Sequence, residues 1–474
     1  MTKKREWATL LSVLCLAELA GSLETTLVFA TVPGAIRQFG DPVAVAWLVT
    51  GYFLVAGASA ALCGRLGDLI GRSTMLAIVL AVAGAGSVVS ALASELRWII
   101  VGRSIQGVAG AVLPLCYGLV REHMPTEKLS FGLAAITAVA SLGAAGGFLI
   151  GGVIADHWHW QHIFTASAAL ATGAFLLSLL MLPRSRGAGG MGQRSDLLGG
   201  ILFAPAVGLV LLAISQASTA GLARGPTLFL LGGVALLAVW VRHELRQPNP
   251  LIDIRLLAQR PVALANINAL LVSLGAFQVM QIFPILIQQP VWTGIGFGLT
   301  ATMTGFLKLP SNVASALGAI WAGRLARGRD GQVAIAVGTL LTLLAWIGLY
   351  LGNAQLWLVI LFICMSSAGV VISLTGTVAV IVEHVPTERT SEATGITMVL
   401  RMTFQGIGAQ IVAGLFVAGR MEAGPSKATY LLPEAVLASI GYVAFACLLS
   451  VINAQLLRGV ISRVPAGLRG PRDA

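Results

Sequence analysis

The stretch Glu122-His-Met-Pro-Thr-Glu-Lys128 recurs later in the chain as Glu383-His-Val-Pro-Thr-Glu-Arg389. A second stretch, Gly64-Arg-Leu-Gly-Asp68, has a weaker match at nearly the same spacing in Gly323-Arg-Leu-Ala-Arg327. Two matches at almost one spacing indicate a duplicated sequence with two homologous halves. We therefore expect each half to carry the same elements in the same order.

The composition predicts that these elements are membrane-spanning helices. Hydrophobic residues make up 57% of the 474 residues, and charged residues only 10%. A soluble domain carries roughly a quarter charged residues, so this chain has too few to cover a soluble surface of its size. Long apolar runs alternate with short polar clusters, and a spanning helix needs about 20 apolar residues. The sequence thus predicts an all-α integral membrane protein, and its 56 glycines suit close helix packing in lipid.

The apolar runs predict fourteen spanning helices, at residues 8–33, 44–63, 74–93, 97–119, 130–154, 163–182, 197–216, 226–242, 263–287, 299–322, 332–351, 354–381, 394–418 and 432–456. Residues 1–182 should form an N-terminal six-helix bundle, and residues 262–474 a C-terminal six-helix bundle. Residues 183–261 should add two inserted helices between them. The repeated motifs lie in loops on the same side, so the halves should be related by a pseudo-two-fold axis along the membrane normal.

The net charge of +11 is spread along the chain. Lys3 and Arg5 precede the first apolar run, Arg458 and Arg472 follow the last, and most other basic residues fall in alternate loops. This is the positive-inside pattern, which predicts that both termini lie in the cytoplasm and that the protein spans the cell (inner) membrane. Nucleic acid is not an expected partner, because no folded domain concentrates the charge.

Three motifs resemble those of one family. The loop Gly64-Arg65-Leu-Gly-Asp68-Leu-Ile-Gly71-Arg72 resembles the signature loop of the major facilitator superfamily, and Arg103-Ser-Ile-Gln106-Gly107 resembles its second motif. Leu23-Glu24-Thr25-Thr26 with Pro33 resembles the acid-containing motif of the fourteen-helix drug:proton antiporters. Together with the helix count, the resemblance covers the whole chain. It implies the major facilitator fold, alternating access around a central cavity, and coupling to the proton gradient.

Two features depart from the family pattern. The antiporter motif of the fifth span usually carries prolines, whereas residues 143–152 keep the glycines and have no proline. The first-helix motif usually has aspartate where this chain has Glu24, and asparagine is common where it has Phe29. These departures leave the predicted fold unchanged but weaken the inference of drug export.

The resemblance also implies a conformational role for the motif residues. Glycines allow a tight loop, and Asp68 and Arg72 can lock the cytoplasmic faces together through helix-end and ion-pair contacts. The glycines of the fifth span should supply a smooth surface on which helices approach. The residues assigned to this conformational motif are Gly64, Arg65, Asp68, Gly71, Arg72, Gln106, Gly107, Gly143, Gly147, Gly151 and Gly152.

Charged residues inside spans are costly and normally functional. Glu24 is the leading predicted proton carrier, since a carboxyl group in a poorly solvated site resists ionisation. Arg103, which by resemblance lies near the first helix, would favour the ionised carboxylate and help to eject the proton. Glu18 precedes Glu24 by six residues, so the two point about 120° apart and cannot share one narrow face. The alternative for each is a permanent pair that only pins helices together.

Several other polar residues in spans are candidates for substrate binding, beside Glu24 and Glu18. Lys308 either faces the cavity or snorkels to an interface, and Arg401 has either a cavity or a structural role. Gln278 and Gln281, three apart on the ninth span, are expected to lie on one helical face. Asn266 and Asn268 could extend that surface, or these amides could bond between helices.

No metal site, cofactor or catalytic set is expected. The segment from Asp156 to His162 holds four possible ligands without a standard zinc spacing, and its tryptophans suit the membrane interface. The chain has no phosphate-binding loop of the Gly-x-x-x-x-Gly-Lys-Ser/Thr form. The proton is the expected coupling ion, and the protein is not expected to be an enzyme.

The main hypothesis is a proton-coupled exporter of amphipathic organic compounds, including drugs, that acts as a monomer in the lipid bilayer. The alternative is a proton-coupled carrier of an anionic or zwitterionic metabolite or lipid, by export or uptake, with Lys308 or Arg401 binding the acid group. A receptor or enzyme built on the same scaffold is a third hypothesis, which no nucleophile or long extramembrane domain supports.

Overall fold

The computed structural model is almost entirely helical and describes residues 2–183, 197–220, 224–247, 254–255, 259–326, 331–385, 389–423 and 428–462. The prediction of an all-α chain is therefore confirmed for this part of the sequence, with one short β-hairpin in addition. In the second copies of the repeated motifs, residues 386–388 and 327 lie outside the described residues.

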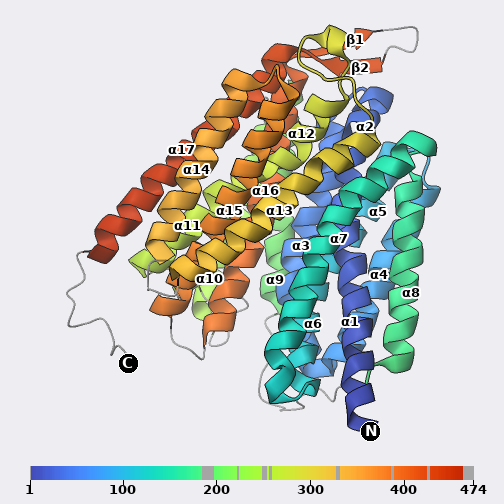
Figure 1. Ribbon diagram of the computed structural model, residues 1–474, viewed down its shortest axis with the longest axis vertical. Helices are drawn as coiled ribbons and strands as arrows, with labels where there is room; N and C mark the ends of the chain where they lie inside the picture. Colours follow the sequence, from blue (N-terminus) through green and yellow to red (C-terminus); the bar gives the residue numbers. More distant parts are fainter. Residues whose placement is uncertain are drawn as a thin grey trace. The chain divides into compact units, whose positions relative to one another are not determined.

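Figure 1 labels the α-helices and strands, and the 3₁₀ helices, written η, carry no label there. The elements of the first part of the chain are α1 (Thr2–Leu27), η1 (Val28–Thr31), α2 (Val32–Phe39), α3 (Pro42–Ile70), α4 (Arg72–Leu92), α5 (Leu96–Gln106), η2 (Gly107–Ala111), α6 (Val112–His123), η3 (Thr126–Lys128), α7 (Leu129–His157), α8 (His162–Met181), α9 (Leu197–Ala220) and α10 (Arg224–Arg246). The remaining elements are α11 (Arg260–Leu274), η5 (Ala276–Gln278), α12 (Val279–Gln288), η6 (Val291–Thr293), α13 (Ala301–Ala326), α14 (Gly331–Gly352), α15 (Leu356–His384), α16 (Thr390–Val417), β1 (Arg420–Ala423), β2 (Ala428–Leu431) and α17 (Pro433–Ser462).

Contacts divide the chain into two compact units. Unit 1 comprises residues 1–251, 279–309 and 405–439, and unit 2 comprises residues 252–278, 310–404 and 440–474. These units are defined by contacts, and the predicted boundaries at residues 182 and 261 stay a prediction.

Within the described residues, 12 helical stretches are long and apolar enough to cross a membrane. Two further helices, α9 and α13, are not among these 12. Only residues Leu202–Ala217 of α9 count as a shorter apolar helix, and α13 carries Lys308, Ser311 and Asn312 in its first half. A multi-pass membrane protein is therefore established, and the count of fourteen helices stays a prediction.

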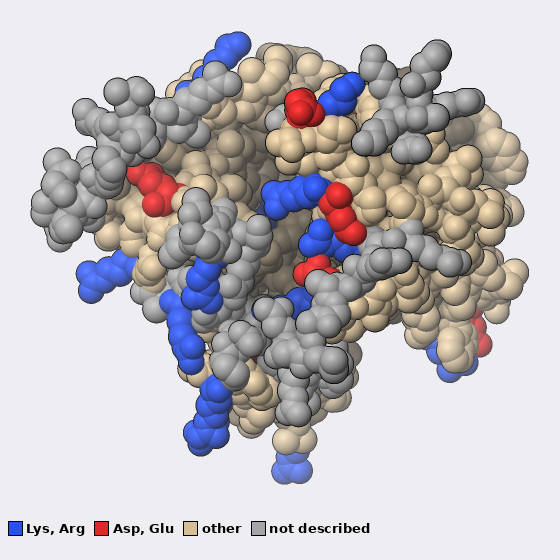
Figure 2. Space-filling model, turned by 90° about the horizontal axis from the view of Figure 1, so that it is seen from below, with Lys and Arg blue, Asp and Glu red and all other residues tan. Residues whose placement is uncertain are grey.

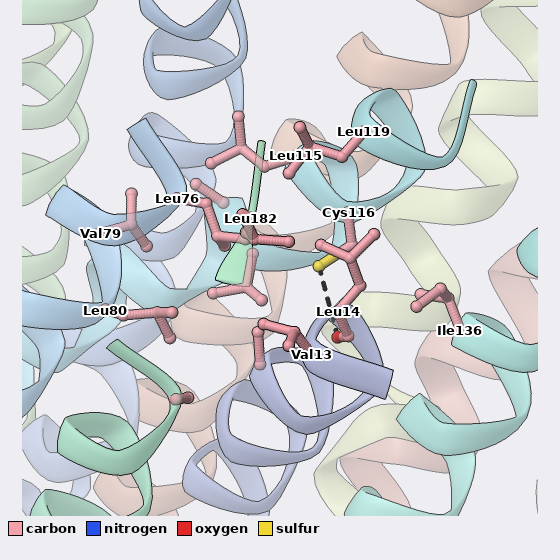
Figure 3. Packing of buried hydrophobic residues seen from close by; sticks show 14 of the residues in the cluster. Val13, Leu14, Leu76, Val79, Leu80, Leu115, Cys116, Leu119, Ile136 and Leu182 are labelled. Atoms are coloured by element: carbon pink, nitrogen blue, oxygen red, sulfur yellow. Dashed lines mark hydrogen bonds between the residues drawn. The ribbon is translucent and has the colours of Figure 1, made fainter. Parts of the chain in front are cut away.

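The lower half of α1 is held in a large apolar cluster of unit 1. Figure 3 shows side chains of α1, α4, α6 and α7 meeting there, with Leu14 of α1 facing Cys116 of α6. Both of these side chains are completely buried, and the Cys116 thiol donates a 3.7 Å hydrogen bond to the Leu14 carbonyl. Burial on this scale orders α1, which also carries the predicted proton site, against its neighbours.

Glycines on one stripe of α7 let it approach α1 closely. A Cβ atom added at Gly143, Gly147 or Gly151 would overlap atoms of α1, and the obstacle at Gly151 is the main-chain carbonyl of Leu27. Gly152 faces a different neighbour, since its added Cβ would overlap the carbonyl of Ala301 in α13. The fifth-span glycines are therefore packing positions between helix backbones.

We expect Gly151→Ala to destabilise the protein by about 1–3 kcal/mol, because overpacking costs that much and a main-chain carbonyl cannot turn aside. Gly146→Ala is the matched control on the same helix. Its added methyl would meet only Leu23 Cδ2 at 3.5 Å, and alanine is favoured over glycine in helices by about 1 kcal/mol. Thermal unfolding in detergent should show a lower midpoint for Gly151→Ala alone. Equal losses in both variants would contradict this account of the interface.

The two predicted inserted helices, α9 and α10, belong to unit 1, where α9 packs on α3. Trp47 of α3 donates its indole N–H to Ser215 of α9 at 3.0 Å, and Phe203 of α9 packs on Trp240 of α10. Only 17% of the apolar window of α10 is buried, against 72% for the first span. Within this unit α10 is thus an outer helix.

In unit 2, a buried amide joins three helices. Asn268 of α11 donates to Ser373 at 2.8 Å and to Thr377 at 3.0 Å in α15, and it accepts from Ser450 of α17 at 2.7 Å. Asn266 accepts from Thr397 of α16 at 2.8 Å. Of the two roles left open for these asparagines, the structure favours hydrogen bonding between helices.

Candidate functional site

Glu24 lies at the end of a chain of hydrogen bonds in unit 1. Its carboxyl group is buried, with 3% of the residue exposed, and Ser87 of α4 donates to its Oε1 atom at 2.9 Å. Ser87 accepts from the amide of Gln106 at 2.7 Å, and Gln106 Oε1 accepts from Arg103 Nη1 at 3.0 Å. Side chains from α1, α4 and α5 thus connect a buried carboxyl group to a buried guanidinium group.

Arg103 bonds mainly to the main chain. Its Nε donates to the carbonyl of Leu48 in α3 at 3.1 Å, and its Nη1 donates to the carbonyl of Glu24 in α1 at 2.9 Å. The guanidinium carbon lies 4.2 Å from the ring centroid of Tyr52, a cation–π distance. The resemblance implied that Arg103 lies near the first helix, and it does. Among the described contacts, however, it makes no ion pair with the Glu24 carboxyl group.

Three polar partners in this site were missed from the sequence. Ser87 completes the chain to Glu24, and the Tyr52 hydroxyl shares a 2.7 Å hydrogen bond with the Thr25 hydroxyl. Thr25 belongs to the first-helix motif, which gave it no role of its own, whereas hydroxyl residues are common in spans and no local signal distinguishes Ser87 or Tyr52. The structure places Gln106 beside the predicted proton site, and its expected conformational role stays a prediction. Gly107 begins η2, where a Cβ would overlap the carbonyl of Tyr52.

Glu18 is buried separately, lower on α1. It is 4% exposed, and its Oε2 atom has no hydrogen-bond partner among the described residues. It lies between Leu14 and Ala20, two members of the apolar cluster of Figure 3. Glu18 is therefore a second buried acid on α1, apart from the hydrogen bonds around Glu24.

The signature loop joins α3 to α4. Gly71 has a φ of 98°, which favours glycine, and it ends α3 and precedes α4. Arg72 pairs with Asp68 at 2.8 Å and donates from Nη1 to the carbonyl of Gly118 in α6 at 3.1 Å. No Cβ at Gly64 would meet an atom within 4 Å. The loop residues therefore link three helices of unit 1, and a lock between the halves stays a prediction, as does the role of Arg65.

Figure 2 shows the face of the protein that lies at the bottom of Figure 1. Blue Lys and Arg side chains are spread widely over it, and red acidic ones are fewer. The chain's N-terminus lies at the lower end in Figure 1. The orientation that the positive-inside pattern predicts stays a prediction.

The two cationic substrate candidates both lie against aromatic rings. Lys308 of α13, in unit 1, is 2% exposed, and its Nζ lies 5.8 Å from the ring centroid of Phe283. This burial argues against snorkelling to an interface. Arg401 of α16, in unit 2, lies 5.4 Å from the Phe277 ring, and its Nε has no hydrogen-bond partner within the part of the chain that the structure describes.

The two glutamine candidates do not share one continuous α-helix. Gln278 ends the 3₁₀ turn η5 and donates to the carbonyl of Ser273 at 3.2 Å, whereas Gln281 lies in the following helix α12. The interruption after Leu274 precedes both residues, and η5 runs directly into α12, so a shared face of Gln278 and Gln281 stays a prediction. Gln281 Nε2 is buried and has no partner among the described residues, so it keeps a free donor.

Asp156, from the segment considered for metal binding, caps a helix. Its carboxylate accepts from the amides of Ala301 at 3.0 Å and Thr302 at 2.7 Å, at the start of α13. An acidic side chain at a helix N-terminus satisfies amides that the helix leaves unpaired. Among the described residues, no group of three or more His, Cys, Asp or Glu could hold a metal ion.

Long apolar helices with charged side chains buried inside them define a multi-pass membrane transporter. The chain belongs to the Major Facilitator Superfamily, whose profile matches residues 14–409. This is a family of transporters and not of enzymes, so the expectation that the protein is not an enzyme is confirmed.

Curated relatives are bacterial transporters. The chain spans about half the length, 52%, of the Mycobacterium tuberculosis multidrug resistance protein B homolog, at 29% identity over 58% of this chain. Multidrug resistance protein Stp of the same species is 28% identical over 84% of this chain and 73% of that protein. A triacylglyceride transporter of Mycolicibacterium hassiacum is 33% identical over 69% of this chain and 61% of that protein.

Solved structures show the same fold. A bacterial homolog of the human lysosomal transporter Spinster, in an inward-facing and unoccupied conformation, has a TM-score of 0.69 at 12% identity. The match covers 96% of this chain and 98% of that one. The predicted major facilitator fold is therefore confirmed.

Proposed function

We propose that this protein is a proton-coupled secondary transporter that exports amphipathic organic compounds, including drugs, by alternating access. The observation that carries the proposal is the buried Glu24 carboxyl group, bonded by Ser87 and without an ion pair among its described contacts. A buried carboxyl group that is not locked in an ion pair can exist with or without its proton. Protonation from one side and release to the other would couple the gradient to the conformational change.

The names of two relatives support export of drugs. Both Mycobacterium tuberculosis proteins are called multidrug resistance proteins. We place this chain with the fourteen-helix drug:proton antiporters because of Glu24 and its motif, with α9 and α13 completing the helix count. By the same resemblance, and by the basic loops, we propose a monomer in the inner membrane with both termini in the cytoplasm.

Contacts in unit 1 support alternating access. The Asp156 carboxylate on α7 caps α13, and the carbonyl of Ala301 in α13 lies against Gly152 of α7. A capping contact of this kind is worth about 0.5–2 kcal/mol, small enough to break and reform during a transport cycle.

Lys308 favours the second candidate function, transport of an anionic or zwitterionic metabolite or lipid. A fully buried ammonium group over an aromatic ring can bind an acid group once a cavity opens beside it. One relative is named a triacylglyceride transporter, and this name supports a lipid as the substrate in the second candidate function.

The test is transport by the purified full chain in proteoliposomes with an imposed pH gradient. A cationic dye, ethidium, and an anionic dye, carboxyfluorescein, are offered in parallel. The proposal expects ethidium to move against its concentration gradient only while the pH gradient lasts. Movement of carboxyfluorescein alone, lost in Lys308→Gln, would replace it with the second candidate. Indifference of both dyes to the pH gradient would refute proton coupling.

A further inference from the structure

The hydrogen bonds around Glu24 have a fixed direction. An arginine side chain only donates, so the oxygen of the Gln106 amide must face Arg103. The NH₂ group of Gln106 then faces Ser87 and donates to the Ser87 oxygen at 2.7 Å. One of the two acceptor positions of the Ser87 hydroxyl is therefore always occupied.

The single hydrogen of Ser87 has two acceptors within reach. Oε1 of Glu24 lies at 2.9 Å from Ser87 Oγ, and the carbonyl oxygen of Ala83, one turn earlier on α4, lies at 3.0 Å. The hydroxyl can bond only one of them at a time in full strength. Its choice depends on whether Glu24 needs a donor or an acceptor.

We propose that Ser87 is a positioning residue that serves Glu24 in both of its protonation states by rotating its hydroxyl group. When Glu24 is ionised, the hydroxyl donates to Oε1, a charge-assisted bond of about twice the usual strength. When Glu24 is protonated on Oε1, the Ser87 hydroxyl donates to the carbonyl oxygen of Ala83. The remaining lone pair of the Ser87 oxygen then accepts the hydrogen bond that the Glu24 carboxyl group donates. In each state the Ser87 hydroxyl donates to an acceptor, and the carboxyl proton of Glu24, when present, has one as well.

This inference rests on the proposed role of Glu24 as the proton carrier. The charged or titratable groups beside Glu24 are Arg103 from α5 and Tyr52 from α3, and Glu18 of α1 acts on Tyr52. The stripe of α7 against α1 is made of glycines and adds no such group. Arg103 reaches the carboxyl group through Gln106 and Ser87, so removal of Ser87 cuts the link and leaves the arginine in place.

Ser87→Ala removes the donor that stabilises the ionised form. Because the lost bond is stronger to a carboxylate than to a neutral carboxyl group, Glu24 should hold its proton to higher pH. The midpoint of Glu24 titration is expected to rise by about one pH unit, from the usual strength of hydrogen bonds to charged groups. Ser87→Thr keeps the hydroxyl group and should restore the native midpoint.

Infrared spectroscopy of the full chain in liposomes follows this titration without any substrate. The carboxyl band of Glu24 is identified as the band that Glu24→Gln removes, and its intensity is recorded against pH. Ser90→Ala is the matched control, because Ser90 also lies in α4 and is fully buried, but bonds the carbonyl of Ile99. The proposal expects a raised midpoint in Ser87→Ala and native midpoints in Ser90→Ala and Ser87→Thr.

Two outcomes would overturn it, and they differ. If the Glu24 band titrates with the same midpoint in Ser87→Ala as in the native chain, Ser87 has no positioning role, while the proton carrier stands. If the Glu24 band does not titrate in the native chain over the whole pH range in which the protein stays folded, the proposed proton carrier fails as well.

Discussion

Glu24→Gln is expected to reduce pH-driven accumulation of ethidium to the level of protein-free liposomes. Glutamine has nearly the same shape as glutamic acid, and its amide oxygen can still accept the hydrogen bond that Ser87 donates to Oε1. It cannot bind and release a proton. The change should therefore remove coupling and leave the packing of α1 unaltered.

The assay needs a measure of folding and two comparison variants. Exchange of labelled for unlabelled ethidium without a pH gradient should continue in Glu24→Gln, because exchange needs substrate binding and no net proton movement. Glu122→Gln, at the end of α6 beside His123, should behave as the native chain. Glu18→Gln reports separately on the second buried carboxyl group. Retained coupling in Glu24→Gln together with lost coupling in Glu18→Gln would move the proton site to Glu18.

The fold was predictable from the sequence because membrane solvation leaves few alternatives. Lipid cannot hydrogen-bond the backbone, so each long apolar run must become a helix. The first predicted span, residues 8–33, was found as a helical stretch that continues to Phe39. The interruption after Leu274 was not predicted, since one apolar run can hold an α-helix or an α-helix broken by a 3₁₀ turn.

The partners in the site could be predicted only in part. Charge inside a span identified Glu24 and Arg103, because charge is costly there. Ser87 was not identified, because a serine can satisfy its own hydroxyl by bonding a carbonyl one turn earlier, as it does with Ala83. Which serine instead meets a carboxyl group depends on the rotation of one helix against another. A single sequence does not contain that information.

Arg103→Lys is expected to destabilise the protein by about 2–5 kcal/mol, although the charge is retained. The planar guanidinium group reaches the carbonyl of Leu48 in α3, the carbonyl of Glu24 in α1 and the amide of Gln106 at once. A lysine ammonium group is a single point with three donors and cannot reach acceptors that far apart. The variant would keep a buried cation with fewer partners, the costly arrangement in a protein interior.

Unfolding of the purified protein by SDS in mixed detergent micelles measures this loss. Arg97→Lys is the matched control on α5, because its side chain is 73% exposed, pairs with the exposed Glu95 and lies 6.0 Å from the ring centroid of Trp98. A change there should stay within about 0.5 kcal/mol. If the two variants lose the same free energy of unfolding, Arg103 does not hold α1, α3 and α5 together. Its role in the span would then be electrostatic alone. If Arg103→Lys alone is destabilised, the arginine is a structural crosslink between α1, α3 and α5.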